Sequence, residues 1–154
     1  MENIKPLTID ELYITPFTAR RVFNEDGVMS WVPVQRNLNP TGQRHIDYIA
    51  RCMADGHTDL DWIAERMGCR RSDVNGWIRL MTGLNGYEFR HQYIFRLADD
   101  LLRYTSMSVD KIAHRVGCYS ASSLTQQFIK YRHITPADRR QAIRQPRDEG
   151  RYRL

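Results

Sequence analysis

Three side chains with hydrogen-bonding groups, Ser122, Thr125 and Gln126, lie three and four residues apart in the second half of the chain. If this stretch is helical they share one face, because residues at these spacings are neighbours on a helix. Hydroxyl and amide groups can donate to and accept from the edges of DNA bases, and Gln suits adenine in particular. Ala121 lies beside them and could contact a thymine methyl group. The pattern predicts a face that reads base pairs.

Two short helices separated by a glycine are predicted to hold this face. A buried stripe with i, i+3, i+4, i+7 spacing is formed by Val109, Ile112, Ala113 and Val116. Gly117 suits the end of the first helix, where φ is often positive, and Ser120 can cap the second by accepting a backbone N–H. In the second helix we expect Leu124, Phe128 and Tyr131 to face the core. The arrangement is that of a helix-turn-helix, with the polar face outward for a major groove.

The same pattern occurs once before in the chain. Asp61–Cys69 aligns with Asp110–Cys118, with Asp, Ile, Ala, Arg, Gly and Cys at matching places. Chance similarity between two amphipathic helices is the alternative, but identities in one register favour duplication of a supersecondary unit. One residue inserted in the second copy then aligns Val74 with Leu124. The outward positions of the first copy are Ser72, Asn75, Gly76 and Arg79.

Residues from about 43 to 140 resemble the DNA-binding domain of the AraC/XylS transcription regulators. The signature is in the second copy: Ile112-Ala113, Arg115-Val116-Gly117, Ser120, Leu124, Phe128, Lys130 and Thr135-Pro136. Between the copies the matching residues are Gly83, Glu88-Phe89, Ala98 and Leu101-Leu102. The resemblance implies an all-α fold of two helix-turn-helix subdomains joined by a long linker helix. It also places base contacts at Ala121, Ser122, Thr125 and Gln126, in agreement with the helix periodicity.

Contacts to the DNA backbone position such a protein without reading sequence. The candidates lie near the two outer helices: Arg70, Arg71, Tyr119, Ser120, Lys130, Arg132 and Arg140. Backbone amides at the two helix N-termini add further donors. Arg66 and Arg115 recur in both copies and are expected to brace each copy, with phosphate contact as the alternative.

The first copy departs from the family pattern. Gly76 removes a contact side chain and costs about 1 kcal/mol relative to Ala inside a helix. Arg70 stands where a Ser or Thr cap is usual, and Asp99 and Asp100 occupy linker positions that are often basic. We therefore expect the second copy to dominate binding.

Residues 1–40 lie outside the resemblance and are expected to form an extension with a β-hairpin. Phe17 to Phe23 and Val28 to Val34 are rich in β-formers and flank the turn sequence Asn24-Glu-Asp-Gly27. Phe17 and Trp31 within them are expected to be packing anchors rather than a ligand cage. The extension is far shorter than a full effector-sensing domain.

Residues 41–143 form the predicted DNA-binding domain. Its parts are helix-turn-helix 1 at about 59–82, a linker helix at about 87–104 and helix-turn-helix 2 at about 108–131, followed by a last helix from Thr135-Pro136 to about Ile143. Asn39-Pro40-Thr41 looks like an earlier helix start, and Thr58 and Asp61 have capping-box spacing. The linker helix would span roughly 27 Å, close to the roughly 34 Å between successive major grooves. One monomer could therefore engage two neighbouring groove segments.

The net charge of +5 is concentrated at the C-terminus. From Lys130 onward there are eight Lys or Arg and three carboxylates, a surplus equal to that of the whole chain. Residues 144–154 show no periodicity and are predicted to be a disordered basic tail. The tail is either simply solvated or an arm that contacts phosphates.

Several functional classes find no support in the sequence. There is no phosphate-binding glycine loop, paired catalytic acids or nucleophile motif, so we expect no enzyme and no cofactor. The three cysteines lack CxxC spacing, and Cys69 and Cys118 are expected to fill equivalent turns rather than bind metal. No apolar run reaches the length of a membrane span and no signal peptide is evident, so a cytoplasmic, nucleoid-associated protein is expected.

The sequence thus predicts a sequence-specific, double-stranded-DNA-binding transcription regulator of AraC/XylS type. The competing hypothesis is a protein-interaction module on the same fold, an anti-activator or adaptor, in which the hairpin edge pairs with a partner. The patterns leave open whether a regulator would contact RNA polymerase or occlude a promoter. They also leave open whether it is a monomer or a weak dimer.

Overall fold

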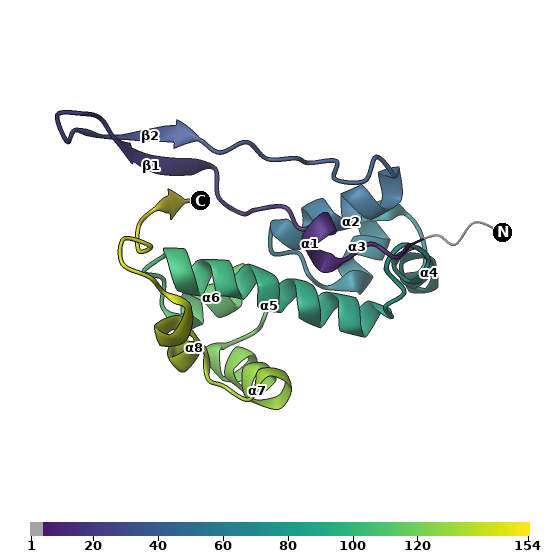
Figure 1. Ribbon diagram of the computed structural model, residues 1–154. Helices are drawn as coiled ribbons and strands as arrows, with labels where there is room; N and C mark the ends of the chain where they lie inside the picture. Colours follow the sequence, from purple (N-terminus) through teal and green to yellow (C-terminus); the bar gives the residue numbers. More distant parts are fainter. Residues whose placement is uncertain (1–4) are drawn as a thin grey trace. The chain divides into compact units, whose positions relative to one another are not determined.

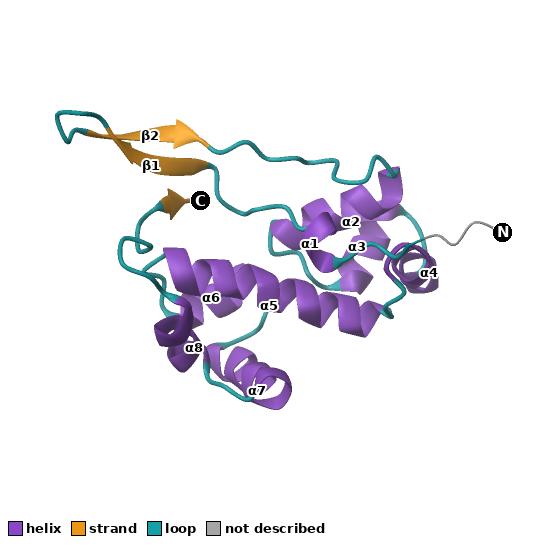
Figure 2. Ribbon diagram, in the orientation of Figure 1, coloured by secondary structure: helices purple, strands orange, loops and turns teal. Residues whose placement is uncertain are grey.

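The computed structural model describes residues 5–154 and is mainly helical (Figure 1). The helices are α1 Ile9–Leu12, α2 Arg44–Ala54, α3 Leu60–Met67, α4 Arg71–Thr82, α5 Gly86–Tyr104, α6 Val109–Arg115, α7 Ala121–Arg132 and α8 Pro136–Ile143. The strands are β1 Ala19–Phe23, β2 Met29–Pro33 and β3 Tyr152–Arg153 (Figure 2). This confirms an all-α fold with two helix-turn-helix motifs, a long linker helix and a small N-terminal hairpin.

The chain divides into two compact units. Unit 1 comprises Met1–Ile14 and Asn37–Arg96, and unit 2 comprises Thr15–Arg36 and Leu97–Leu154. Each unit contains one helix-turn-helix: α3 and α4 in unit 1, α6 and α7 in unit 2. Helix α5 is continuous, with its first part in unit 1 and its last turns in unit 2.

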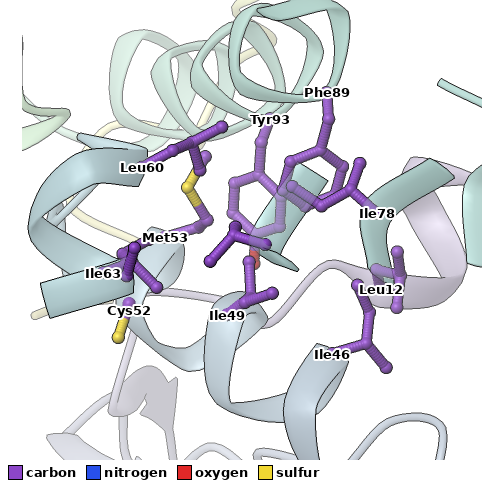
Figure 3. Close-up of a cluster of buried hydrophobic side chains, with 12 residues drawn as sticks. Leu12, Ile46, Ile49, Cys52, Met53, Leu60, Ile63, Ile78, Phe89 and Tyr93 are labelled. Carbon is purple, nitrogen blue, oxygen red and sulfur yellow. The ribbon is translucent and has the colours of Figure 1, made fainter. Parts of the chain in front are cut away.

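The core of unit 1 is built from apolar side chains of α1 to α5 (Figure 3). Phe89 and Tyr93 of α5 reach toward Ile49 of α2 in this cluster. The Tyr93 hydroxyl accepts from the Ile14 N–H (3.1 Å) and donates to the Ala50 carbonyl (3.3 Å). A buried phenol needs such partners, and these bonds also attach the N-terminal segment to the core.

Helix α2 begins later than predicted. The start expected at Asn39-Pro40-Thr41 is wrong, because Gln43 is the N-cap and accepts from the Ile46 N–H at 2.7 Å. The buried Asp47 carboxylate accepts from the Thr41 hydroxyl (2.7 Å) and the Gly42 N–H (2.9 Å). These bonds hold residues 41–42 as a turn in front of the helix.

The first helix-turn-helix has a different cap from the predicted one. Asp59, not Thr58, is the N-cap of α3, and its carboxylate accepts from the Asp61 N–H at 2.9 Å. Gly68 ends α3 with φ of 67°. The Cys69 N–H then donates to the Ala64 carbonyl at 3.0 Å, which closes the turn.

The second helix-turn-helix follows the prediction closely. Gly117 has φ of 83°, and the Ser120 hydroxyl accepts from the Ser123 N–H at 3.2 Å as the N-cap of α7. The Cys118 N–H donates to the Ala113 carbonyl at 2.8 Å. This is the same bond that closes the turn of unit 1, so the two copies share turn geometry as well as sequence.

The C-terminal segment differs from the expected disordered tail. Tyr152–Arg153 forms β3 and pairs antiparallel with β1, giving the strand order β2-β1-β3. Phe17, an expected packing anchor, is buried and stacks on Tyr152 with ring centroids 5.1 Å apart. Upstream of β3, the Asp148 carboxylate is 1% exposed and accepts from Arg103 Nε at 2.7 Å. The segment is ordered by partners far away in sequence, which periodicity cannot reveal.

Candidate nucleic-acid interface

Helix α7 has one buried side and one exposed polar side. Leu124 and Phe128 are fully buried, while Ser122 and Gln126 are exposed and Thr125 is half-buried. Ala121 is also half-buried, at the start of the helix. These four residues, Ala121, Ser122, Thr125 and Gln126, form what we call the α7 face.

Tyr131 does not follow the expected pattern. It was predicted to face the core together with Leu124 and Phe128, but its side chain is 37% exposed. Its ring lies 5.2 Å from the Lys130 ammonium. Tyr131 is in the last turn of α7, beyond the two residues that anchor the helix.

Helix α4 repeats the exposure pattern of α7. Over residues 71–80 and 121–130, the order of exposed, half-buried and buried positions is the same in the two helices. Val74 and Ile78 occupy the buried places of Leu124 and Phe128. The corresponding α4 face comprises the positions predicted from the duplication, Ser72, Asn75, Gly76 and Arg79. Ser72, Gly76 and Arg79 are exposed and Asn75 is half-buried.

Asn75 is engaged within unit 1. Its side-chain oxygen accepts from Arg71 Nε at 3.3 Å. The same oxygen lies 2.2 Å from the place where a Cβ on Gly86 would stand. The Asn75 amide is therefore turned toward the first residue of α5.

The two arginines at the start of α4 have acidic partners. Arg71 Nη1 lies 3.0 Å from Asp61, and Arg70 Nε lies 3.6 Å from Asp73. The Arg70 side chain makes no cap, but the Asp73 carboxylate accepts from the Arg70 N–H at 3.0 Å. Asp73 also supplies a negative charge to the positive end of the helix dipole. With 83% of its side chain exposed, Arg70 remains accessible to a phosphate.

The candidate backbone contacts of unit 2 fall into two groups. Tyr119 is 92% exposed, and Lys130 is exposed on α7. Ser120 caps α7, but a hydroxyl that accepts can still donate. Arg132, in contrast, lies 3.3 Å from Asp99, which also binds Arg139 through two hydrogen bonds of 3.0 Å each.

Arg140 is not brought to the α7 surface. Its guanidinium donates to the carbonyl of Leu102 (2.9 Å) in the last turn of α5 and to those of Thr105 (3.4 Å) and Met107 (2.5 Å) just after the helix. Arg144 donates to the Leu102 carbonyl as well, at 3.0 Å. The last carbonyls of a helix lack intrahelical partners, so this pair of arginines completes the C-terminus of α5. Burial, together with the neighbouring charge of Arg144, lowers the pKa of Arg140.

Sequence reasoning did not find these roles for Asp99, Arg140 and Arg144. Their partners lie about 33 to 42 positions away along the chain. The two linker aspartates were noted only as departures from the family pattern. Acidic residues followed by several arginines suggest an ion pair, but the sequence does not show which arginine binds which carboxylate.

Residues 5–154 contain no candidate metal site. No group of three or more His, Cys, Asp or Glu in this part of the chain could hold a metal ion. Cys52 and Cys118 are buried and Cys69 is half-buried, all as free thiols. Burial raises the pKa of Cys52 and of Cys69, which keeps these thiols protonated at neutral pH. In the same residues, no helix is both long and apolar enough to cross a bilayer.

The helical part of the chain is similar to known proteins in sequence and in fold. Residues 63–142, slightly more than half of the chain, match the family model described as a helix-turn-helix domain. The C-terminal domain of AraT, a response regulator from Geobacillus stearothermophilus, is similar in fold, with a TM-score of 0.57 and 20% identity over 66% of this chain and 84% of that one. No curated protein sequence gives a significant match.

Two further solved structures are similar. An AraC-type transcriptional regulator from Chromobacterium violaceum has a TM-score of 0.54 and 22% identity over 68% of this chain and 96% of that one. The DNA-binding domain of AdpA, a global transcriptional factor solved with a target DNA, has a TM-score of 0.55 and 25% identity over 64% and 90% of the two chains. With its duplicated motif, its linker helix and the family match, the chain belongs to the AraC-type helix-turn-helix domain family.

Proposed function

We propose that this protein is a sequence-specific regulator of transcription that binds double-stranded DNA. The observation that carries the proposal is the α7 face, an exposed polar surface on a helix whose opposite side is anchored by Leu124 and Phe128. A second helix of the same exposure pattern, α4, strengthens it. An α-helix with such a face fits the major groove of B-form DNA.

Base reading is assigned mainly to unit 2. Gln126 is exposed in the second turn of α7 and can bind adenine through two hydrogen bonds. Ser122 and Thr125 can add hydroxyl contacts, and Ala121 can contact a thymine methyl group.

The α4 face of unit 1 has fewer side chains that are free to contact a base pair. Gly76 has no side chain where unit 2 has Gln126, and Asn75 is held by Arg71. Ser72 and Arg79 remain exposed, and Arg79 suits guanine. We infer that unit 2 supplies most of the sequence discrimination and that unit 1 contributes affinity.

Phosphate contacts are assigned to groups that the fold leaves accessible. These are Arg70, Tyr119 and Lys130, with the first amides of α7 and the Ser120 hydroxyl. Arg71 and Arg132 share their charge with carboxylates, and Arg140 supports the fold instead. The complex of AdpA with its target DNA is consistent with this use of the domain.

One chain carries two reading helices, so we propose that a monomer suffices to engage neighbouring groove segments. A regulator of this kind binds the nucleoid DNA in the cytoplasm. If it activates transcription, it would contact RNA polymerase.

A second function, protein interaction, is favoured by the hairpin. Phe23, Val28 and Met29 are large apolar residues that stay exposed near its turn. In the sheet order β2-β1-β3, the outer edge of β2 has no partner strand among the described residues. An anti-activator or adaptor could pair a protein partner with this edge.

Selection of bound oligonucleotides from a random double-stranded pool tests the main proposal. The purified full chain is incubated with the pool at several salt concentrations, and the bound fraction is sequenced. A regulator enriches a small set of related sequences and loses affinity steeply as salt rises. An unenriched pool, or binding that does not respond to salt, would contradict DNA reading and favour the interaction module.

A further inference from the structure

Unit 1 has an open hollow of about 500 Å³ between α2 and α3. Its lining residues are Arg44, His45, Tyr48, Arg51, Arg66 and Met67. The volume lies within the range of about 300–1,000 Å³ typical of small-molecule sites. None of the six belongs to the α4 or α7 face.

The charge around this hollow is positive and unneutralised. Three of the lining residues are arginines and none is a carboxylate. Within residues 5–154, Arg44, Arg51 and Arg66 form no ion pair, although Arg70 and Arg71 in the same unit do. Asp55 is near enough to influence the Cys52 thiol, but it does not line the hollow.

Two of the three guanidiniums, those of Arg51 and Arg66, and the imidazole of His45 are held in place by neighbouring groups. Arg51 Nη1 donates to the Leu38 carbonyl (2.9 Å) and to Asn39 Oδ1 (2.8 Å). The Arg66 guanidinium lies 4.8 Å from the centre of the Trp62 ring. His45 stacks on Trp77 with centroids 4.2 Å apart and planes 10° from parallel. Groups that are already positioned lose little conformational entropy on binding a ligand.

Tyr48 adds a neutral hydroxyl to the three guanidiniums, and this hydroxyl shares a hydrogen bond with Cys52. Burial, together with the neighbouring Cys52 thiol, raises the pKa of Tyr48, although the nearby charges of Arg66 and Arg51 act to lower it. The phenol therefore stays protonated and brings no negative charge to the hollow. Arg51 of α2 and Arg66 of α3 both line the hollow, so the two helices bring positive charge to the same place.

We propose that this hollow is an anion site that takes phosphate groups. Guanidinium groups match phosphate oxygens through two parallel hydrogen bonds, and such charge-assisted bonds are stronger than neutral ones. Two sources could supply the phosphate: a free phosphorylated small molecule or the backbone of bound DNA. The inference goes beyond base reading, because it assigns a ligand to residues that the reading helices do not use.

Pyrophosphate titration of the full chain, at constant ionic strength, tests the site. Trp62 and Trp77 stack on Arg66 and His45, so intrinsic fluorescence should change in a saturable way. Combining Arg44→Gln with Arg66→Gln should weaken the apparent affinity at least about tenfold, as expected from losing charge-assisted bonds. The exposed Lys111→Gln in α6 removes one charge elsewhere and should leave affinity unchanged.

The proposal is overturned if fluorescence does not saturate, or if Lys111→Gln weakens binding as much as the double change. Circular dichroism checks that the double variant is folded. Should it unfold, Arg44→Gln alone serves, since Arg44 is exposed, and it should still weaken binding measurably.

A second arm separates the two sources of phosphate, using a duplex from the selection experiment. If the DNA backbone occupies the hollow, pyrophosphate competes with DNA, and the double variant lowers the salt slope by about 0.9 for each lost contact. If a small molecule is the ligand, DNA affinity and slope stay unchanged while pyrophosphate binding is lost. If the chain binds pyrophosphate but selects no DNA sequence, the proposed function is wrong and the anion site is still supported.

Discussion

The side-chain oxygen of Asn75 occupies the space in which a side chain on Gly86 would begin. An ideal Cβ on Gly86 would lie 2.2 Å from Asn75 Oδ1 and 2.9 Å from Leu60 Cδ1. Both distances are shorter than van der Waals contact. The start of α5 therefore packs against α3 and α4 of unit 1 only because residue 86 is glycine.

Gly86→Ala should destabilise the protein by about 1–3 kcal/mol, the usual cost of overpacking, despite the better helix propensity of Ala. Urea denaturation measures the change. Asn75→Ala is the matched background, because it removes one of the two clashing groups, and the cost of Gly86→Ala should be smaller there. An equal cost in both backgrounds would contradict the contact.

Arg140→Ala should lower the free energy of unfolding, and not only the affinity for DNA. The change removes three hydrogen bonds from a charged group, although Arg144 still donates to the carbonyls of Leu102 and Thr105. A hydrogen bond to a charged group contributes about 1.5–3 kcal/mol. Urea denaturation of the variant should show this loss. Full stability combined with weakened DNA binding would instead make Arg140 a phosphate contact.

The attachment of the C-terminal segment should depend on pH through Asp148. Burial alone would raise the pKa of Asp148, but hydrogen bonds from Arg103 and the Gln145 N–H, with nearby positive charge, hold it below its ordinary value. A carboxyl with a lowered folded-state pKa stabilises the fold above the unfolded pKa of about 3.9, and this contribution is lost as the pH falls through the folded-state value.

The protection of the Thr18 and Arg21 amides against hydrogen exchange, relative to the intrinsic rate at each pH, should therefore fall below about pH 3.9. These amides donate to the Arg153 and Arg151 carbonyls. Asp148→Asn should give fast exchange already at neutral pH. Protection that is unchanged in Asp148→Asn would show that the segment is held without this carboxylate.

Lys130→Ala should weaken binding to all DNA sequences alike. Lys130 is exposed on α7 and is assigned to the phosphate backbone, so its loss should reduce the salt slope by about 1 without changing sequence preference. Fluorescence anisotropy with selected and random duplexes, at several salt concentrations, measures both quantities. A loss confined to the selected duplex would place Lys130 among the base-reading residues instead.

The sequence predicted those parts of the fold that depend on local pattern. The stripe through Ile112, the cap at Ser120 and the positive φ of Gly117 are confirmed because each depends on neighbours within a few residues. The hairpin around the turn at Asn24 was predictable for the same reason.

The remaining features depend on partners far along the chain. Asp148 is bound by Arg103, 45 positions away, and this contact helps order a tail that lacks any periodicity. The turn before α2 is set by the buried Asp47, and the orientation of Asn75 by the absence of a side chain on Gly86. Sequence patterns identify such residues as polar or small, but they do not identify the groups that these residues meet.

The claim that α7 reads bases is tested most directly by Gln126→Ala. The random-pool selection is repeated with this variant and the enriched sequences are compared with those of the unaltered chain. We expect discrimination to fall by about 1–3 kcal/mol at one base step, while preferences at other positions and the stability in urea stay unchanged. An unaltered sequence preference would show that the α7 face does not contact base edges as proposed.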